Sequence, residues 1–459
     1  MGQRGIIKQK NETKRGQKLN LKHILRIGKF QKSDQNHLIR GKHQVNLEYK
    51  LFTSKKATIF SKYSGFITIG DGALILDVPI NFNFCEEYNK SMDFIKRFAS
   101  SIYDYPGKII TLNFEKCKKA DSAALFVLQI IRLELLNKLE NFQKRLNYIN
   151  IIPKVEVTNS LSLDVLRLMR LNGFPIDIND IGNIEYDSNL VPLHTMGYYK
   201  GEGTQKHYLE NKKTIYSNKV IVYLNECFSE LGYEFTDTYK NKLNGIIGEV
   251  LGNAEDHSNE GTWFISGNFS EEKIDDINED FVSELNLTIL NFGESFYEGF
   301  YNKRKENHIH YNLVNENVKS LLLIDSKSKL KEEQLFTLWM MSDGITRLKF
   351  QEPSRGTGTM NFINSFGDLA GYVNVKKGFK PNLSIFTGST QLICDSEYKP
   401  FLKDGVKCLS LNSENDLKKL PNESHLKKLN IHFPGTLLSI KIYLNKNHLN
   451  QQYGGENNE

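Results

Sequence analysis

The sequence is poor in cysteine, with five in 459 residues, and none of them forms a C-x-x-C pair. The number is odd and the positions are widely spaced along the chain: Cys85, Cys117, Cys227, Cys394 and Cys408. A disulfide framework needs pairs of cysteines, and most structural zinc sites need clusters of them. The cysteine pattern therefore indicates neither feature, and we expect all five thiols to be reduced.

Long apolar runs are also missing. No run approaches the roughly 20 residues that a helix needs to cross a bilayer. Charged residues stand where a secretory signal would have its apolar region, and the first residues lack the Ser or Thr of a myristoylation signal. We therefore expect a cytoplasmic protein without membrane contact. A hydrophobic content of 39% still suffices for substantial cores, and the length predicts two or three domains.

Acidic residues are scarce in residues 1–56, which hold fifteen Lys or Arg and three Asp or Glu. This basic N-terminal arm has a formal charge of +12, whereas the whole chain has +6. Such an arm can bind nucleic acid or another acidic surface. A charged terminal segment is more often only solvated, and the arm lacks the regular aromatic residues of a base-stacking platform. Nucleic-acid binding through residues 1–56 stays an open alternative.

Residues 57–185 alternate strand and helix patterns. The run KIITLNF (108–114) predicts a buried strand, and Asp121 is a good N-cap for the long apolar helix that follows. A second strand is expected in RLNYINII (145–152), and a Leu-rich helix after it ends near Gly173. This order of elements predicts an α/β domain.

Two stretches of this region, LNFEKCKKADSAALFVL and LRLMRLNGF, resemble the STAS domain of the anti-sigma-factor antagonist type. The resemblance covers residues 57–185. In that family the serine of the Asp-Ser pair can be phosphorylated, which implies Ser122 as a candidate phosphoacceptor. Asp-Ser is also a routine helix cap, and both interpretations remain open.

Two segments show little periodicity. Residues 179–218 have frequent Asn, Asp and Gly, and we interpret residues 186–204 within them as a linker between domains. Residues 446–459 are polar, and we expect them to form a disordered tail. The region between these segments, residues 205–445, is the predicted second domain.

One helix in that domain concentrates polar residues in the stretch GEVLGNAEDHSN (248–259). Thr236 or Asp237 can cap this helix, and apolar residues recur along it at intervals of three and four, forming one buried stripe. Glu249, Asn253 and His257 are four residues apart and share the flank beside that stripe. A carboxylate there can deprotonate a nucleophile, and an amide oxygen suits Mg²⁺. Alone, the pattern would indicate only the polar face of an amphipathic helix.

The stretch GEVLGNAEDHS resembles the N-box of the GHKL ATPases, the superfamily of histidine kinases, Hsp90, MutL, gyrase B and the anti-sigma serine kinases. The resemblance implies ATP and Mg²⁺ as cofactors. It also implies that Glu249 is the catalytic base, that Asn253 is the Mg²⁺ ligand, and that His257 lies near the phosphates. We call this stretch the N-box motif.

Two further motifs follow in the order of that family. The stretch LNFGES resembles the adenine box Asp-x-Gly-x-Gly, with Asn291 in place of the acid, Gly293 as the first glycine and Ser295 in place of the second. A neutral amide makes a weaker hydrogen bond to the adenine amino group than a carboxylate does. The stretch EPSRGTGTMNFINSF resembles the second glycine box, which implies phosphate contacts from the following residues: Arg355, Gly356, Thr357, Gly358 and Thr359.

Together the resemblances imply an α/β (α+β) protein, in which a STAS-like domain precedes a GHKL, or Bergerat, α/β sandwich whose mixed sheet has helices on one face. The implied function is that of an ATP- and Mg²⁺-binding ATPase or protein kinase acting as a nucleotide-dependent regulatory switch. The alternatives are a non-catalytic nucleotide-binding or interaction module and a nucleic-acid-associated ATPase. Expected partners besides ATP are another protein or the STAS-like domain of the same chain, and a second copy in a homodimer.

Overall fold

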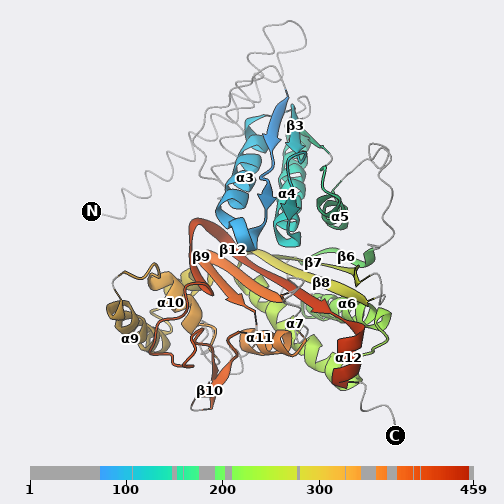
Figure 1. Ribbon diagram of the computed structural model, residues 1–459. Coiled ribbons are helices and arrows are strands. Elements are labelled where there is room, and N and C mark those ends of the chain that lie inside the picture. Colours follow the sequence, from blue (N-terminus) through green and yellow to red (C-terminus); the bar gives the residue numbers. More distant parts are fainter. Residues whose placement is uncertain are drawn as a thin grey trace, which may run out of the picture. The chain divides into compact units, whose positions relative to one another are not determined.

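The structure is a computed structural model of the whole chain, shown in Figure 1. It describes the following residues: 73–105, 107–146, 152–158, 160–174, 192–201, 209–275, 280–325, 327–342, 358–369, 380–395, 397–403 and 405–453. The basic arm of residues 1–56 lies outside them, so the prediction about nucleic acid stays a prediction. Among the described residues, no helix has both the length and the apolar character needed to cross a bilayer.

The protein is a mixed α/β protein, as the sequence predicts, and the chain forms two compact units. Among the described residues, the smaller unit contains those of 73–75, Phe98–Thr111 and Leu133–Glu156. The larger unit contains the other described residues, which lie in Leu76–Arg97, Leu112–Arg132 and 157–453. Parts of the first predicted domain therefore belong to the same compact unit as the C-terminal sheet.

The first region has a three-stranded sheet in the order β1-β3-β5 and a parallel pair of two-residue strands, β2 and β4. The bounds are β1 (Leu74–Asp77), β2 (Asn81–Phe82), β3 (Ile109–Asn113), β4 (Lys119–Ala120), β5 (Lys154–Val157), α3 (Phe84–Asp104), α4 (Ser122–Leu146) and α5 (Leu163–Leu171). One prediction is partly wrong. Residues 145 and 146 end α4 and do not begin a strand, because the strong helix formers Lys, Arg and Leu extend that helix.

Asp121 joins the beginnings of two helices. Its Oδ1 accepts a hydrogen bond from the Ala124 backbone N–H at 2.7 Å, which confirms the predicted cap of α4. Its Oδ2 accepts one from the Phe84 N–H at 2.8 Å, in the first turn of α3. Burial raises the pKa of the Asp121 carboxyl, although these N–H groups act in the opposite direction. The cap fixes the position of Ser122, the first residue of α4.

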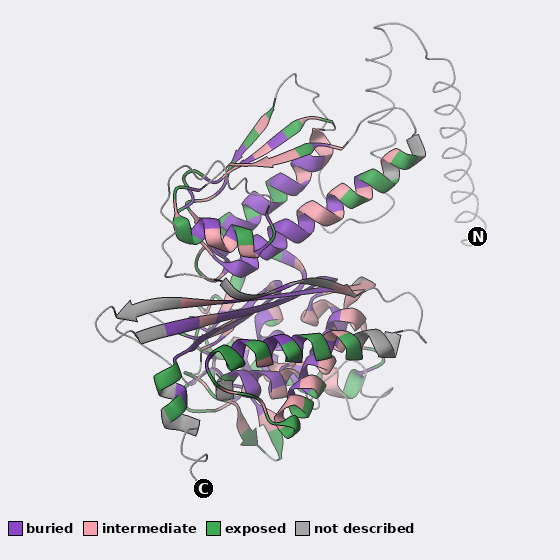
Figure 2. Ribbon diagram, turned by 90° about the vertical axis from the view of Figure 1, so that its right-hand side faces the viewer, coloured by how far each residue is buried: buried purple, intermediate pink, exposed green. Residues whose placement is uncertain are grey.

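The first three turns of α4 are buried on every side. Each residue from Asp121 to Ile131 is buried, and Figure 2 shows that exposed residues appear only further along the helix. A helix that is apolar all round has no face for solvent and must be surrounded by protein. The Ala-, Leu- and Ile-rich sequence of this helix therefore explains its central place in the packing.

The C-terminal region has a five-stranded sheet in the order β6-β7-β8-β12-β9. Its strands are β6 (Pro192–Gly201), β7 (Ser258–Asp275), β8 (Asp280–Gly293), β9 (Asn382–Cys394) and β12 (Leu426–Leu444). All four neighbouring pairs are antiparallel, so the prediction of a mixed sheet is wrong. Two helices, α6 (Leu209–Glu230) and α7 (Asp237–Asp256), separate β6 from β7 and return the chain in the opposite direction.

Two segments that we expected to be irregular contain regular structure. Strand β6 lies within the predicted linker of residues 186–204, because an edge strand is held by backbone pairing with β7 and needs no side-chain pattern. Helix α12 (Lys446–Tyr453) begins the predicted tail, where the buried Leu449 packs into the core and Asn450 accepts a hydrogen bond from the Tyr233 hydroxyl. Residues 454–459 lie outside the described part.

The two faces of the five-stranded sheet differ in chemistry. Helices α6, α7 and α11 (Gly358–Leu369) cover one face, where strand residues such as Ile289 and Ile440 join the apolar core (Figure 1). The opposite face carries buried polar residues, among them Asn268, Asn286 and Ser384. Buried polar groups are stable only when they are hydrogen-bonded, so this face needs matching polar partners.

A chain of hydrogen bonds supplies those partners within the larger unit. The Asn268 Nδ2 donates to the Ser122 Oγ at 2.7 Å, and the Asn286 Nδ2 donates to the Asn268 Oδ1 at 2.9 Å. The Asn286 Nδ2 also lies 2.7 Å from the Glu284 Oε1, which is paired with the Lys441 Nζ at 3.1 Å. The network connects the beginning of α4 to the centre of the sheet.

The Glu284–Lys441 ion pair stabilises the fold over a defined range of pH. Burial, the largest single effect, raises the pKa of Glu284. The Lys441 ammonium and hydrogen bonds from Asn286, Lys441 and Tyr443 together outweigh it, so the pKa lies below its ordinary value of 4.5. A carboxyl with a lowered pKa contributes stability above the pKa of the unfolded chain and loses it as the pH falls through the folded pKa. The pair is therefore fully effective at neutral pH.

We expect Lys441→Met to lower the free energy of unfolding at neutral pH by on the order of 1–3 kcal/mol. This range lies between the losses that are typical for breaking exposed and buried ion pairs. The difference from the parent should shrink as the pH falls below 4.5, where Glu284 becomes protonated. Urea unfolding at a series of pH values measures this. Lys428→Met, at an exposed position of the same strand, is the control, and equal losses in both variants would contradict a role for the pair.

Candidate functional site

Helix α7 presents the N-box motif as the sequence predicts. The Thr236 Oγ1 accepts a hydrogen bond from the Tyr239 N–H at 3.3 Å and caps the helix. The predicted apolar stripe is buried and consists of Leu243, Ile246, Ile247, Val250, Leu251 and Ala254. This stripe packs into the core between α7 and the sheet, so the helix has a fixed rotation about its axis.

Glu249, Asn253 and His257 lie along the flank of α7 beside the buried stripe, and all three are partly buried. His257 is the C-cap residue, and its imidazole packs edge-on against the Phe296 ring with centroids 5.7 Å apart. A carboxylate, an amide and an imidazole are thus stacked one turn apart on one flank. They can offer a base, an oxygen ligand for a hard cation and a further polar contact.

The C-terminal end of α7 is joined to the end of β8. The His257 carbonyl accepts a hydrogen bond from the Glu294 N–H at 3.0 Å, and Ser258 pairs with Gly293 in the antiparallel ladder. The N-box motif and the adenine-box motif are about 40 residues apart in the sequence, yet these two contacts bring them together. The end of α7 and the end of β8 are therefore neighbours.

Asn291 lies on the helix-covered face of the sheet. It pairs with Trp263 on β7 and with Thr436 on β12, and directly opposed residues in a ladder point to the same face. Its side chain is 2% exposed, and the Nδ2 has no hydrogen-bond partner among the described residues. A buried amide without a partner costs free energy, which makes Asn291 a candidate ligand-binding residue.

Two hydroxyl groups continue this row across the sheet. The Thr436 Oγ1 lies 3.0 Å from the Thr387 Oγ1, and both side chains are buried. Thr387 pairs with Thr436 in the ladder of β9 and β12, so its side chain is on the same face as that of Asn291. Three neighbouring strands thus place an amide and two hydroxyls in one row on the same face, and the Thr387 hydroxyl also accepts a hydrogen bond from the Phe296 N–H at 3.0 Å.

Ser295 has a structural role at the position where the adenine box of the GHKL family has its second glycine. It caps α8 (Phe296–Asn302), and its Oγ accepts a hydrogen bond from the Glu298 N–H at 3.1 Å. In return, the Glu298 Oε2 accepts one from the Ser295 N–H at 2.9 Å, which completes a capping box. The serine therefore ends β8 sharply and starts a helix.

The second glycine box is only partly within the described residues. Gly358 begins α11, so the helix predicted after this box is confirmed, and Thr359 is partly buried in its first turn. Helix α11 packs against α7. Arg355, Gly356 and Thr357 lie outside the described residues, and their predicted phosphate contacts stay predictions.

The basic run of residues 303–305 has local partners. The Lys303 Nζ lies 3.3 Å from the Glu306 Oε1, and the Arg304 guanidinium stacks over the Tyr301 ring at 4.0 Å from its centroid. The run precedes α9 (His308–Ile324) and α10 (Glu332–Trp339), both in the segment between the two glycine motifs. These contacts favour a solvated charge run over a phosphate site for Lys303 and Arg304.

Ser122 is not part of this constellation. The residue is 7% exposed, and its hydroxyl accepts hydrogen bonds from Asn268 and from Asn172, the latter at 3.4 Å. Asn268 pairs with Asn286, which is five residues before Asn291 on β8 and so points to the opposite face. The structure therefore separates the candidate phosphoacceptor from the N-box and adenine-box residues by the thickness of the sheet.

No family model, curated protein sequence or solved structure matches the chain.

Gly435 allows β12 to approach the end of β8. Its φ is +138°, and a Cβ at this position would lie 2.2 Å from the Asn291 backbone oxygen and 2.9 Å from the Gly293 nitrogen. Such a φ is essentially restricted to glycine. Neither backbone segment can give way without disturbing the ladder that positions Asn291.

We expect Gly435→Ala to lower the free energy of unfolding by about 2–5 kcal/mol, because strain in φ and a backbone clash add together. Gly405→Ala is the matched control, since Gly405 also has a positive φ, +78°, but no atom within 4 Å of the added Cβ. That control should cost only about 1–2 kcal/mol. Thermal or urea unfolding compares the two variants, and equal losses would show that the close approach to β8 has no energetic consequence.

Proposed function

We propose that residues 205–445 bind ATP with Mg²⁺ on the helix-covered face of the five-stranded sheet and act as a nucleotide-dependent regulatory switch. The observation that carries this proposal is the junction of α7 and β8, where the His257 carbonyl meets the Glu294 N–H and joins the N-box flank to the buried Asn291. A sheet with helices on one face and these motifs in this order supports a GHKL-type ATP-binding domain. The segment 57–185, with its strand-helix-strand-helix order, is proposed as STAS-like.

The flank of α7 supplies the proposed metal and phosphate end of the site. Asn253 provides an amide oxygen, a hard ligand of the kind that Mg²⁺ accepts while it keeps several waters. Glu249, one turn earlier, is the proposed base that orients or deprotonates the attacking nucleophile. Magnesium, when bound, would neutralise charge that develops on the transferred phosphoryl group.

The row of Asn291, Thr436 and Thr387 supplies the proposed base-binding end. The Asn291 amide can accept a hydrogen bond from the adenine amino group through Oδ1 and donate one to an adjacent ring nitrogen through Nδ2. A carboxylate at this position could only accept. Because the amide offers both a donor and an acceptor, it pairs with a guanine edge as readily as with an adenine edge, and Asn291 alone does not select ATP over GTP.

The proposed reaction is hydrolysis of ATP or transfer of its terminal phosphoryl group. Transfer to Ser122 of the same chain would need the beginning of α4 to leave the polar face of the sheet, because the hydroxyl is buried in the network with Asn268. In the conformation of the chain described here, the proposed phosphoryl acceptor is therefore water or another molecule. The phosphoacceptor role of Ser122 requires an opened state.

A non-catalytic nucleotide-binding module is the second candidate function. Its support is the neutral Asn291, which weakens the charge-assisted hydrogen bond that a carboxylate would make to adenine. The presence of both Glu249 and Asn253 on one flank favours the catalytic alternative. Measurements of binding and of turnover separate the two candidates.

We expect Asn253→Ala to abolish Mg²⁺-dependent ATP binding and to leave the fold intact, because the side chain lies on the flank and outside the apolar stripe of α7. Isothermal titration with ATP, in the presence and absence of Mg²⁺, measures the effect. Asn241→Ala is the control, since Asn241 is an exposed residue near the start of the same helix. Equal affinity of the Asn253 variant and the parent for Mg²⁺ and ATP would contradict the assignment of Asn253 as the metal ligand.

We expect Glu249→Gln to keep ATP binding and to slow turnover about 10²- to 10⁴-fold, because an amide of the same size cannot take up a proton. Release of phosphate from saturating ATP measures turnover, and Glu226→Gln, at an exposed position of α6, should leave the rate unchanged. An undiminished rate in Glu249→Gln would show that Glu249 is not the base. A parent without any turnover would support the binding module.

A further inference from the structure

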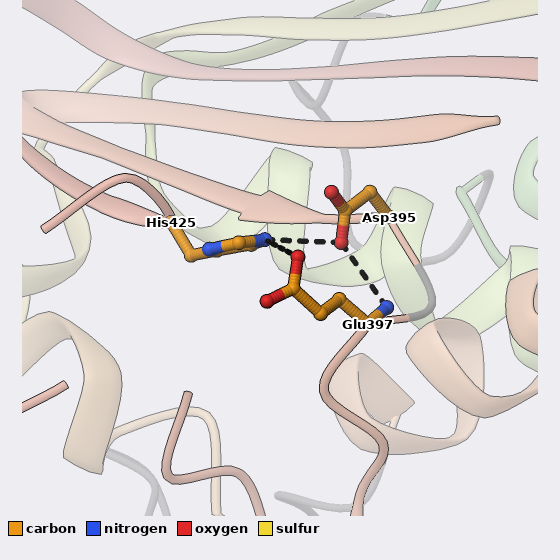
Figure 3. A group of neighbouring side chains, drawn as sticks. All are labelled: Asp395, Glu397 and His425. Atoms are coloured by element: carbon orange, nitrogen blue, oxygen red, sulfur yellow. Dashed lines mark hydrogen bonds and ion pairs between the residues drawn. The ribbon is translucent and has the colours of Figure 1, made fainter. Parts of the chain in front are cut away.

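Three side chains that can bind a metal meet where β9 ends and β12 begins: Asp395, Glu397 and His425 (Figure 3). Asp395 directly follows β9, and His425 directly precedes β12. The Ile393 N–H donates a hydrogen bond to the His425 carbonyl at 2.8 Å and holds the two strand ends together. The cluster thus rests on the backbone of the central antiparallel ladder.

The separations between the candidate ligand atoms suit one shared ion. The His425 Nε2 lies 3.1 Å from the Asp395 Oδ1 and 3.5 Å from the Glu397 Oε2, and all three ligand atoms lie within 4.8 Å of one another. An ion bound tetrahedrally at about 2.0–2.2 Å from each ligand sets its ligands about 3.3–3.6 Å apart. Only small movements are needed, and Glu397, whose side chain is 50% exposed, can make them.

The neighbours of His425 hold its ring in a ligand geometry. The Ser424 Oγ lies 2.7 Å from the His425 Nδ1 and can accept a hydrogen bond from it; in that neutral tautomer the Nε2 lone pair is directed at the two carboxylates. The ring is also packed edge-on against the Tyr398 ring, with centroids 4.7 Å apart. A bare Nε2 facing two carboxylates is electrostatically unfavourable unless a metal ion or a proton lies between them.

The carboxylate of Asp395 is oriented in the same way. The Lys380 Nζ pairs with its Oδ2, while the Oδ1 faces His425 and accepts a hydrogen bond from the Glu397 N–H at 3.2 Å. The His425 and Asp395 side chains are only 7% and 8% exposed. Outer partners that fix each ligand in this manner are typical of protein metal sites.

We propose that Asp395, Glu397 and His425 bind one divalent transition-metal ion, with Zn²⁺ as the preferred ion. One imidazole nitrogen and two carboxylate oxygens, with a fourth position for water, form a ligand set that zinc accepts. Mg²⁺ and Ca²⁺ prefer oxygen ligands alone, so the imidazole argues against them. This site is separate from the proposed nucleotide site and does not depend on it.

The bound ion would link the end of β9 to the beginning of β12 across the segment 397–425. An ion that binds the folded chain and not the unfolded one stabilises the fold by an amount that grows with the logarithm of its concentration once that exceeds its dissociation constant. The competing occupant is a proton on Nε2, which would make the cluster an ordinary histidine–carboxylate ion pair.

The test uses the full-length chain, freed of metal by a chelator and dialysed, without nucleotide. Titration calorimetry with Zn²⁺ should show one ion bound per chain, and Zn²⁺ should raise the Tm. Co²⁺ at the same site should produce the visible absorption of a tetrahedral complex, which weak surface binding to other histidines does not give. Glu397→Gln should weaken Zn²⁺ binding at least about tenfold and remove the Co²⁺ absorption.

Glu414→Gln is the matched control, because Glu414 is an exposed acid in the same segment and is paired with Lys419. It should bind Zn²⁺ and Co²⁺ as the parent does. Glu397 is exposed, so its variant is expected to fold, and circular dichroism verifies this. Absence of Zn²⁺ binding in the parent, or equal binding by the parent and Glu397→Gln, would overturn the proposal and leave only the ion pair.

Discussion

The alternation of side chains along β7, β8 and β12 separates the candidate functional residues onto two faces of one sheet. Asn291 and Thr436 point toward the helix layer, whereas Asn268 and Asn286 point away from it. Both faces are buried, so each must satisfy its own polar groups. A shift of one residue in the register of β8 would exchange the two faces and dismantle both sets of contacts at once.

The two faces satisfy that requirement in different ways. On the face away from the helices, protein groups suffice, since Ser122, Asn268, Asn286, Glu284 and Lys441 form one continuous network. On the helix-covered face, the Asn291 Nδ2 has no partner among the described residues. The unpartnered Asn291 amide and the flank with Glu249 and Asn253 both favour a ligand on the helix-covered face. The network on the opposite face is a structural contact.

Local rules predicted the helices and their caps well, because Asp121, Thr236 and the apolar stripe of α7 act through neighbours in the sequence. Pairing between distant segments could not be predicted in the same way. Strand β6 is held by backbone hydrogen bonds to β7, and no pattern in the sequence of β6 indicates this pairing. The contact of Ser122 with Asn268 spans 146 residues, and His425 meets Asp395 only because β9 and β12 are neighbours.

Hydrogen–deuterium exchange with a non-hydrolysable ATP analogue and Mg²⁺ tests the central claim most directly, because it locates the ligand on one face of the sheet. We predict slower amide exchange at the C-terminal end of α7, at the end of β8 and at the beginning of α11. Exchange at the beginning of α4 and around His425 should stay unchanged. Unchanged exchange at α7 and β8 under saturating analogue, or protection confined to α4, would contradict the central claim.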